Sequence, residues 1–343
     1  MRLKQIVLIL ISALLLSNGA LAQSQDWSQR ALNRIANPPL GLPLVPEPKT
    51  NKATVEKISL GRKLFFDARL SRNGAISCAF CHNPEQGFGD NDLATPIDTK
   101  GRSARRNSPT IFNVAYQRTM FHDGRDTSLE TQIYGPFLDK AEMANPSIGW
   151  LLQTITGLED YWGLFEKAFG QPINANNLGQ ALAAYQRSLL SANSPFDKWQ
   201  YGGQKQALSA DAIRGLELFK GKAGCARCHL IEKDHALFTD HKFHNTGAGL
   251  KIKADFGRME VTDEEADIFR FKTPILRNIA LTTPYMHDGS LQTLAEVVSF
   301  YNKGPAKILA PLHLNKTEQA DLVAFLNQLT GDNVAELIGK AKN

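Results

Sequence analysis

The sequence predicts a mainly α-helical protein whose two halves share one plan. Apolar residues recur at helical spacing in several segments, while strand-like alternation is scarce. Two pentapeptides of the same form, Cys78–His82 and Cys225–His229, use every cysteine of the chain. An ungapped internal repeat follows each pentapeptide. At 343 residues the chain is long enough for two domains, each with its own hydrophobic core.

The N-terminus has the features of a secretory signal peptide over residues 1–22. Arg2 and Lys4 precede the apolar run Ile6–Leu16, and small residues at the end of the segment supply a cleavage site. The apolar run is too short to span a bilayer, so a retained anchor is the less favoured alternative, and no later stretch has transmembrane length. Removal of this segment and its two basic residues lowers the net charge from +5 to +3. We therefore expect a periplasmic protein without a membrane span.

The first half of the mature chain is expected to cover residues 23–202. It opens on Pro38–Pro48, a proline-rich segment without regular structure. Apolar spacing predicts a helix over Val55–Phe66, directly before the first pentapeptide. The polar, arginine-rich stretch Asp90–Asn107 is typical of a mobile loop. Further amphipathic helices are predicted over Ile148–Ala168 and Leu178–Leu190.

The second half, residues 203–335, begins after the predicted boundary segment Ser191–Gly203, which contains a proline and paired glycines. A helix over Ala210–Phe219 leads into the second pentapeptide, as in the first half. Two more helices are expected over Leu294–Tyr301 and Thr317–Leu329, the latter capped by Asn315 or Thr317.

The internal repeat supports a duplicated architecture. Seven identities fall at one fixed offset of 165 residues, as from His122 to His287. Both copies follow a cysteine pentapeptide in the same order, and the N-terminal copy carries larger insertions. The aligned segments are Ser108–Ala115 with Thr273–Ala280, His122–Gly124 with His287–Gly289, and Leu129 with Leu294.

Each Cys-x-x-Cys-His pentapeptide is typical of covalent haem attachment. The thiols form thioethers with haem vinyl groups, and the adjoining histidine supplies an axial nitrogen to the iron. A redox dithiol or a zinc site is the alternative for a single motif, but two motifs that use all the cysteines favour haem. The sequence thus predicts two cytochrome c-like haem domains in tandem, the N-terminal one enlarged by insertions. The haem-binding residues are Cys78, Cys81 and His82 in the first and Cys225, Cys228 and His229 in the second.

A haem that activates peroxide needs an open axial position and a nearby acid–base group, because a proton moves between the peroxide oxygens. A carboxyl group in apolar surroundings suits this task, since burial raises its pKa. Glu142 lies between Ala141 and Met143 after the Gly135-Pro136 turn and fits better than most acids of the chain. An ordinary solvated glutamate is the alternative from local sequence.

Together these residues resemble the bacterial dihaem cytochrome c peroxidase superfamily, which includes the MauG-like enzymes. The resemblance covers roughly Leu60 to Leu329. Besides both haem motifs, it rests on Leu60–Asp67, Arg106–Thr110, Asp123–Arg125, Leu276–Thr282 and Pro284–Ser290.

The resemblance implies that the N-terminal haem reacts with peroxide and that the C-terminal haem shares or relays electrons. Gln132, Pro136 and Glu142 match distal-pocket positions of the family, with Glu142 as the acid–base residue. Family members also hold a calcium ion between the domains, at positions that match Asn107, Thr282 and Pro284.

Three departures from the family pattern bear on the subclass. Many relatives carry a histidine ligand in the loop before Arg-Asn-Ser-Pro, but the segment 91–106 has none, which predicts an open first haem. Tyr301 stands where those peroxidases place a methionine ligand for the second haem, and MauG-like enzymes also have a tyrosine at this position. The alternative is a packing tyrosine with Met286 or Met259 as ligand. His122 stands where many relatives have a tryptophan between the haems, which leaves the route between them open.

The predicted function is therefore a periplasmic, hydrogen-peroxide-dependent dihaem peroxidase of MauG-like type that oxidises an electron-donor protein or a protein substrate. An ordinary cytochrome c peroxidase with a small cytochrome or cupredoxin donor is the alternative. A non-enzymatic dihaem electron carrier is less favoured because the loop histidine is missing. No run of basic residues with interleaved aromatics indicates a nucleic-acid partner.

Overall fold

The structure, a computed structural model, describes residues 26–98, 100–250, 255–305 and 308–339. The predicted signal peptide lies outside these residues. Within them the chain is rich in helices, and its strands are the short antiparallel pair β1 (Phe243–His244) and β2 (Phe271–Lys272). The mainly α prediction is thus confirmed. In the part of the chain described, no helix is both long and apolar enough to cross a membrane.

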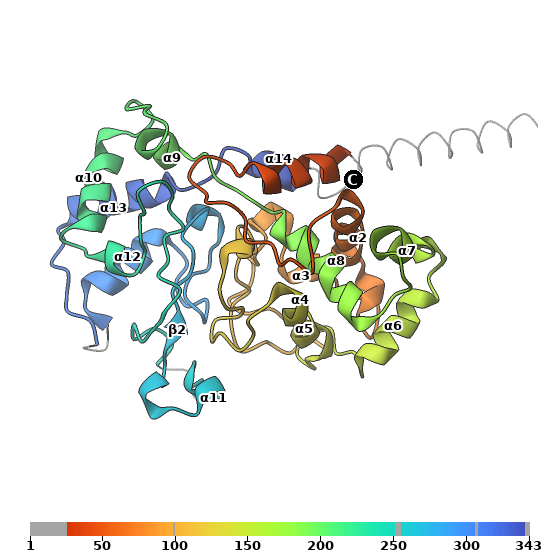
Figure 1. The fold of residues 1–343 in the computed structure, drawn as a ribbon. Coiled ribbons are helices and arrows are strands. Elements are labelled where there is room, and N and C mark those ends of the chain that lie inside the picture. The colour runs from red at the N-terminus through yellow and green to blue at the C-terminus, as the bar shows by residue number, and fades with distance from the viewer. Residues whose placement is uncertain (1–25, 99, 251–254, 306–307, 340–343) are drawn as a thin grey trace, which may run out of the picture.

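The helices form two groups that lie on opposite sides of the molecule (Figure 1). The first group comprises a helix over residues 26–36, α2 (Val55–Phe66), α3 (Cys78–Cys81), α4 (Leu129–Gln132), α5 (Tyr134–Leu138), α6 (Ile148–Thr156), α7 (Leu164–Phe169) and α8 (Ala175–Arg187), with the 3-10 turns η1 (Ala68–Leu70), η2 (Pro84–Gln86), η3 (Val114–Tyr116) and η4 (Glu159–Tyr161). The second comprises α9 (Pro195–Gln200), α10 (Ala210–Lys220), α11 (Met259–Thr262), α12 (Leu294–Asn302) and α13 (Lys316–Asn327), with η5 (Cys225–Arg227), η6 (Glu265–Asp267) and η7 (Ile279–Leu281).

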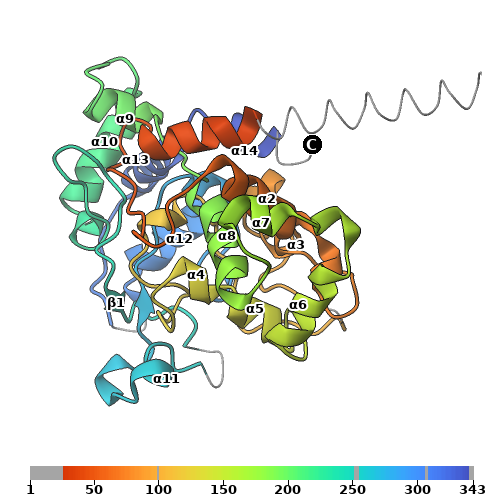
Figure 2. The same cartoon turned by 45° about the vertical axis from the view of Figure 1, so that its right-hand side comes forward.

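Each group has its own hydrophobic core. Leu64 of α2 and Tyr185 of α8 are fully buried in the first core. Phe219 of α10 and Phe325 of α13 pack in the second, and they are joined there by Phe196 of α9. The chain then returns to the first group with α14 (Val334–Gly339), which lies beside the helix over 26–36 in both views (Figures 1 and 2).

A matching helix crossing fixes the position of the haem motif in each half. A Cβ atom added to Gly61 of α2 would lie 1.9 Å from the Ala181 carbonyl oxygen of α8, and one added to Gly215 of α10 would lie 1.9 Å from that of Asp321 of α13. Both glycines are therefore required by close approach of two backbones. In each half the helix that carries the glycine, α2 or α10, precedes the haem motif in the chain, and the helix that it crosses, α8 or α13, follows the motif.

The internal repeat is present in the backbone as well. Asn113 and Asn278 both adopt the left-handed conformation, at φ 59° and 63°, and each begins a 3-10 turn. The isolated bridge between Met120 and Asp126 recurs between Tyr285 and Leu291. The predicted duplication therefore extends to the local fold after each motif.

Most predicted helices are found close to their predicted positions. The helix over Val55–Phe66 matches α2, and Asn315, one of the two predicted caps, accepts a hydrogen bond from the Glu318 N–H at the start of α13. The single helix predicted over Ile148–Ala168 is wrong: α6 ends at the C-cap Gly157, and a 3-10 turn and the left-handed Gly163 precede α7. Gly157 and Gly163, which lie on either side of this 3-10 turn, break the predicted helix.

A lobe of the second half reaches across to the first. This lobe, residues 255–270 with α11, projects from the molecule in Figures 1 and 2. Arg106 of the first half forms an ion pair with Asp255 at 2.7 Å, and Arg105 pairs with Glu260. Two segments far apart in the sequence are thereby joined at the boundary between the halves.

Candidate active site

The histidine of each haem motif is oriented by a backbone carbonyl. His82 Nδ1 lies 3.2 Å from the Phe88 carbonyl oxygen, and His229 Nδ1 lies 2.7 Å from that of Phe238. Because a carbonyl can only accept, Nδ1 carries the proton and Nε2 keeps its lone pair for a metal. Burial lowers the pKa of both imidazoles, which favours the neutral form that ligates iron.

The cysteines have the properties of buried thiols rather than of a redox centre. All four are unpaired. Burial raises the pKa of Cys78 and Cys81 to about 12 and that of Cys225 to about 11. A reactive dithiol requires a lowered pKa instead, so these thiols disfavour a redox centre. Cys228 lies with Asp240 and His244 in a cluster of ligand atoms within 4.8 Å of one another.

A cavity of about 620 Å³ opens at the first motif and brings the predicted site residues together. Its volume is in the range of small-molecule and cofactor sites. Its lining includes Cys78, Cys81, His82, Gln132, Pro136 and Glu142. A space of this kind beside the free Nε2 of His82 fits a haem with a distal pocket on its other face.

Glu142 is the carboxyl group of this cavity whose pKa is raised into the neutral range. Burial, and secondly the charge of Asp139, raise its pKa from 4.5 to about 7, against an opposing effect of Arg125. The Arg125 guanidinium is itself held by Asp123 at 3.1 Å and lies over the Phe121 ring. Glu142 can therefore both take up and release a proton near neutral pH.

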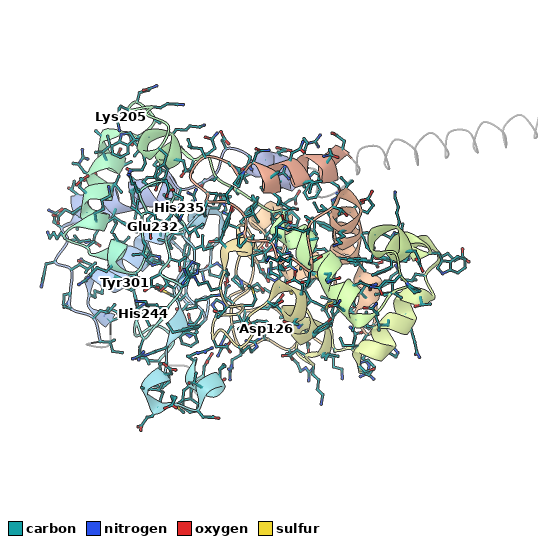
Figure 3. All side chains as sticks on the ribbon, in the orientation of Figure 1. Asp126, Lys205, Glu232, His235, His244 and Tyr301 are labelled. Atoms are coloured by element: carbon teal, nitrogen blue, oxygen red, sulfur yellow. The ribbon has the colours of Figure 1, made fainter. Side chains whose placement is uncertain are left out.

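Tyr301 lies beside the second motif. It sits on α12 in the second half and is labelled in Figure 3. Burial raises the pKa of its hydroxyl to about 12, and this hydroxyl hydrogen-bonds Thr246 and interacts electrostatically with Cys225 and Cys228. The predicted ligand position is thus close to the second haem motif.

The three predicted calcium residues come from both halves, Asn107 from the first and Thr282 and Pro284 from the second. Asn107 is buried; its Nδ2 donates to the Ala94 carbonyl at 3.0 Å and its N–H to the His287 carbonyl at 2.8 Å. Thr282 Oγ1 donates to the Ile279 carbonyl at 3.2 Å, and Pro284 follows two residues later. Among the described residues no hydrogen bond joins Asn107 to the other two, and the calcium site stays a prediction.

The loop over residues 91–106 is tied down at several points. Asn91 Nδ2 donates to the Leu281 carbonyl at 3.1 Å, and Arg102 donates to the Lys140 carbonyl at 2.6 Å. Arg106 is held between Asp123 and Asp255. These contacts differ from the mobile loop expected from composition, because its arginines are paired within and across the halves.

His122 lies where the two copies of the repeat cross. Its Nε2 donates to the Asn107 carbonyl at 3.0 Å, and burial lowers its pKa to about 4, so it is neutral. The Lys272 N–H donates to the His122 carbonyl at 2.8 Å, and the Asn107 N–H donates to the His287 carbonyl at 2.8 Å. Asn107 and Lys272 are equivalent positions of the repeat, as are the two histidines. At this crossing the equivalent positions of the repeat therefore exchange one backbone hydrogen bond in each direction.

Several cavity residues have no signal in the sequence. Asp139 faces the cavity from the first half, and Glu260 and Val261 face it from the lobe of the second. Only the fold brings the lobe to this cavity, so no local spacing could have identified its residues.

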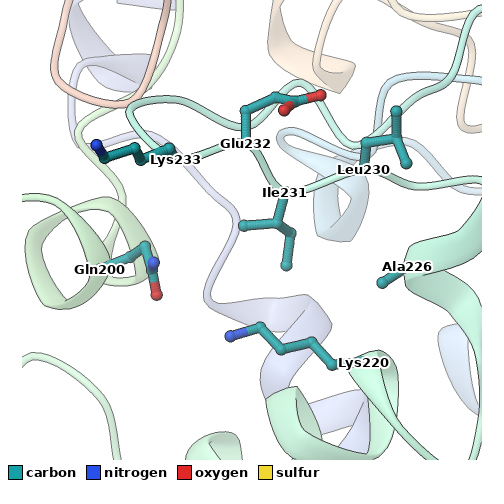
Figure 4. A pocket seen from close by; sticks show the side chains of 7 residues that line it. All are labelled: Gln200, Lys220, Ala226, Leu230, Ile231, Glu232 and Lys233. Atoms are coloured by element: carbon teal, nitrogen blue, oxygen red, sulfur yellow. The ribbon is translucent and has the colours of Figure 1, made fainter.

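A second, smaller cavity of about 390 Å³ lies on the outer side of the second motif. Figure 4 shows Ile231 and Lys220 pointing toward one another inside it, with Ala226 of the motif at one edge. It contains neither His229 nor Tyr301 in its lining and is separate from the predicted ligands.

Comparison with known proteins identifies the family. Residues 55–206 match the family model described as di-haem cytochrome c peroxidase. The methylamine utilization protein MauG of Methylorubrum extorquens is 39% identical over 328 residues, which cover 93% of this chain and 90% of that protein. The chain belongs to the di-haem cytochrome c peroxidase family. This confirms the resemblance inferred from the motifs.

Other relatives within the family carry both kinds of name. The cytochrome c551 peroxidase of Nitrosomonas europaea is 36% identical, with 84% of each chain covered. The crystal structure of a MauG-like protein associated with microbial copper homeostasis has a TM-score of 0.76 and 32% identity, with 87% of this chain and 96% of that chain covered. This di-haem peroxidase is thus an oxidoreductase that uses two haems, and the residues at both motifs fit them.

Proposed function

We propose that this di-haem peroxidase is a MauG-like, peroxide-dependent oxidase with covalently attached haems. The observation that carries the proposal is the cavity that holds His82 and Glu142 together, while the loop over 91–106, which also lines this cavity, has no histidine. Tyr301 beside Cys225 and Cys228 supports a tyrosine ligand for the second haem. An anionic oxygen ligand stabilises oxidised iron and favours storage of oxidising equivalents over simple relay.

The residues of the cavity divide the work at the first haem. The haem, when bound, supplies the iron chemistry that cleaves the O–O bond and accepts two oxidising equivalents. Glu142 takes a proton from one peroxide oxygen and returns it to the other as the bond breaks. Gln132 and Pro136 line the same cavity and limit how peroxide is oriented beside Glu142. His82, with its Nδ1 proton held by Phe88, keeps a fixed orientation as the proximal ligand.

The oxidising equivalents are finally passed to a protein partner in the periplasm, from which electrons are withdrawn. Hydrogen peroxide is the oxidant, and the reductant is an electron-donor protein or a protein side chain oxidised at the surface. Relatives named MauG and cytochrome c551 peroxidase support a protein partner for this chain. A calcium ion held by Asn107, Thr282 and Pro284 is part of the proposal; removal by chelation should change the optical spectrum and lower activity.

An ordinary cytochrome c peroxidase is the second candidate. The similarity to the Nitrosomonas europaea enzyme favours it. A plain electron carrier would need both irons to be closed to peroxide, which the cavity beside Glu142 argues against.

The deciding experiment is an EPR and optical spectrum of the oxidised holoprotein, wild type beside Tyr301→Met. We expect one high-spin haem in both proteins and one low-spin haem whose signal changes in the variant. Two low-spin haems that do not respond to Tyr301→Met would overturn the MauG-like proposal and favour the electron carrier or a reductively activated peroxidase.

A further inference from the structure

The turn between α5 and α6 presents Glu142 to the cavity, and one residue organises it. We propose that Asp139 is a positioning residue for the Glu142 carboxyl group, on which it acts both by holding the turn and by its own negative charge. The proposal rests on the proposed acid–base role of Glu142. It adds a residue that neither the sequence motifs nor the family resemblance identified.

The first line of support is the hydrogen bonding of the turn. Asp139 ends α5 with its N–H bonded to the Gly135 carbonyl at 2.8 Å. Its own carbonyl accepts the N–H groups of Glu142 at 3.1 Å and Ala144 at 3.0 Å. Its Oδ1 accepts the Ala141 N–H at 2.7 Å. Asp139 is therefore bonded to three of the five residues that follow it.

The turn has a backbone conformation that needs such support. Ala144 has a φ of 57°, in the left-handed region that residues with a Cβ atom rarely adopt. On the cavity side, the Met143 N–H donates to the Pro136 carbonyl at 3.1 Å, so α5 and the turn are joined on both sides of Glu142. Loss of the Asp139 Oδ1 contact would free the Ala141 peptide unit, which directly precedes Glu142 in the turn.

The second line of support is electrostatic. Asp139 and Glu142 line the same cavity, and a neighbouring negative charge disfavours ionisation of a carboxyl group. Arg125 is the opposing cation, but its charge is shared with Asp123. The other titratable or charged side chains that face the cavity are Cys78, Cys81, His82, Arg105, Arg106, His122 and Glu260. Among these, Arg105 pairs with Glu260, and Arg106 pairs with Asp123 and Asp255.

Both effects favour the proposed proton transfer through Glu142. A glutamate with an ordinary pKa would be a weak base toward peroxide and would hold the transferred proton only briefly. The charge of Asp139 makes proton uptake by Glu142 easier, while the turn keeps the carboxyl group aimed at the cavity. Because Asp139 is exposed on its outer side, its charge is partly screened, and its electrostatic effect should be modest.

The test uses the oxidised holoenzyme and sodium cyanide as a probe of the first haem. Cyanide binds as hydrogen cyanide, and its proton passes to the distal base, so the pH dependence of the dissociation constant reports the Glu142 carboxyl group. Asp139→Asn keeps an oxygen that can accept the Ala141 N–H but removes the charge. Asp139→Ala removes both this accepting oxygen and the charge. Asp263→Asn, at an exposed left-handed position of the lobe, is the matched control.

We expect the wild-type inflection near pH 7 to fall by roughly half a pH unit in Asp139→Asn, with unchanged thermal stability. Asp139→Ala should show the same fall and, in addition, peroxide reduction slowed about tenfold relative to Asp139→Asn. Glu142→Gln should abolish the inflection, and Asp263→Asn should change nothing.

Each failure has a separate meaning. An unchanged inflection in Asp139→Asn, with the inflection abolished in Glu142→Gln, overturns the electrostatic role of Asp139 and leaves the proposed function intact. Equal peroxide rates in Asp139→Asn and Asp139→Ala overturn the turn-holding role. An inflection that persists in Glu142→Gln overturns the proposed acid–base function and the role of Asp139 with it.

Discussion

Replacement of Glu142 by glutamine should remove activity and stabilise the protein at alkaline pH. A carboxyl group whose pKa is raised from 4.5 to about 7 binds more protons in the folded than in the unfolded state between these values. Stability therefore falls as pH rises through this window, and the full penalty is present above pH 7. The shift corresponds to about 3 kcal/mol, and residual solvation reduces it to roughly 1–3 kcal/mol. Glutamine never ionises and does not incur this penalty.

The assay is urea unfolding of wild type and Glu142→Gln at pH 5 and pH 8, with Glu166→Gln on the exposed face of α7 as the matched control. The Glu142 variant should equal wild type at pH 5 and exceed it at pH 8, while its rate of reaction with peroxide falls by roughly 10²–10⁴-fold. The control should follow wild type at both pH values. A variant that is less stable than wild type at pH 8, or that keeps full activity, would refute the reasoning.

Three further perturbations test the fold around the site. Gly61→Ala should force α2 and α8 apart and lower stability by about 2 kcal/mol or more. It should disturb the optical spectrum of the first haem only, whereas Gly215→Ala should disturb the spectrum of the second haem only. Arg277→Met should cost about 3–5 kcal/mol in urea unfolding, because fully buried Asp197 loses its partner at 2.8 Å; Asp197→Asn in the same chain should recover part of this. Burial opposes ionisation of Asp255, but Arg106 outweighs it and lowers the pKa to about 2. This pair stabilises the fold above the unfolded pKa of about 3.9 and its effect is lost as pH falls toward 2. Asp255→Asn should therefore speed proteolysis within the lobe at pH 7, with little difference from wild type at pH 2.

Much of the fold could be predicted from the sequence because its main signals are local. The helix over Val55–Phe66 has regular apolar spacing, and Asn315 lies three residues before Glu318 in a capping box. The repeat was visible because its conserved spacing encodes a backbone feature, the left-handed asparagine at 113 and at 278. Where glycine overrides apolar periodicity, as at Gly157, periodicity alone predicted one helix instead of two.

The candidate site could be predicted only in the part that motifs encode. Glu142 was identified by the family pattern, whereas Asp139 acts through backbone contacts that have no fixed sequence signature. The tethering of the loop over 91–106 was also missed, because Arg106 finds Asp255 from a segment that is remote in the chain. Such pairs depend on how the halves meet, and composition gives no information about that.

The crossing between the halves offers a physical account of how this chain can carry a histidine at position 122. Two backbone hydrogen bonds join equivalent positions of the repeat, the N–H of Lys272 to the His122 carbonyl and the N–H of Asn107 to the His287 carbonyl. Each donor lies two residues before a proline, Pro109 or Pro274, whose backbone interacts with the proximal histidine of its own half.

A short chain of bonds thus leads from each proximal histidine to the other half without using a side chain at position 122. Ser191 adds a second connection, since its N–H donates to Asn113 at 2.9 Å and its hydroxyl to Asn278 at 3.0 Å. Both connections join equivalent positions of the repeat. Equivalent positions of the duplicated unit therefore supply the contact between the two haem sites. A histidine in place of tryptophan at position 122 changes the side chain beside this contact but leaves its hydrogen bonds in place.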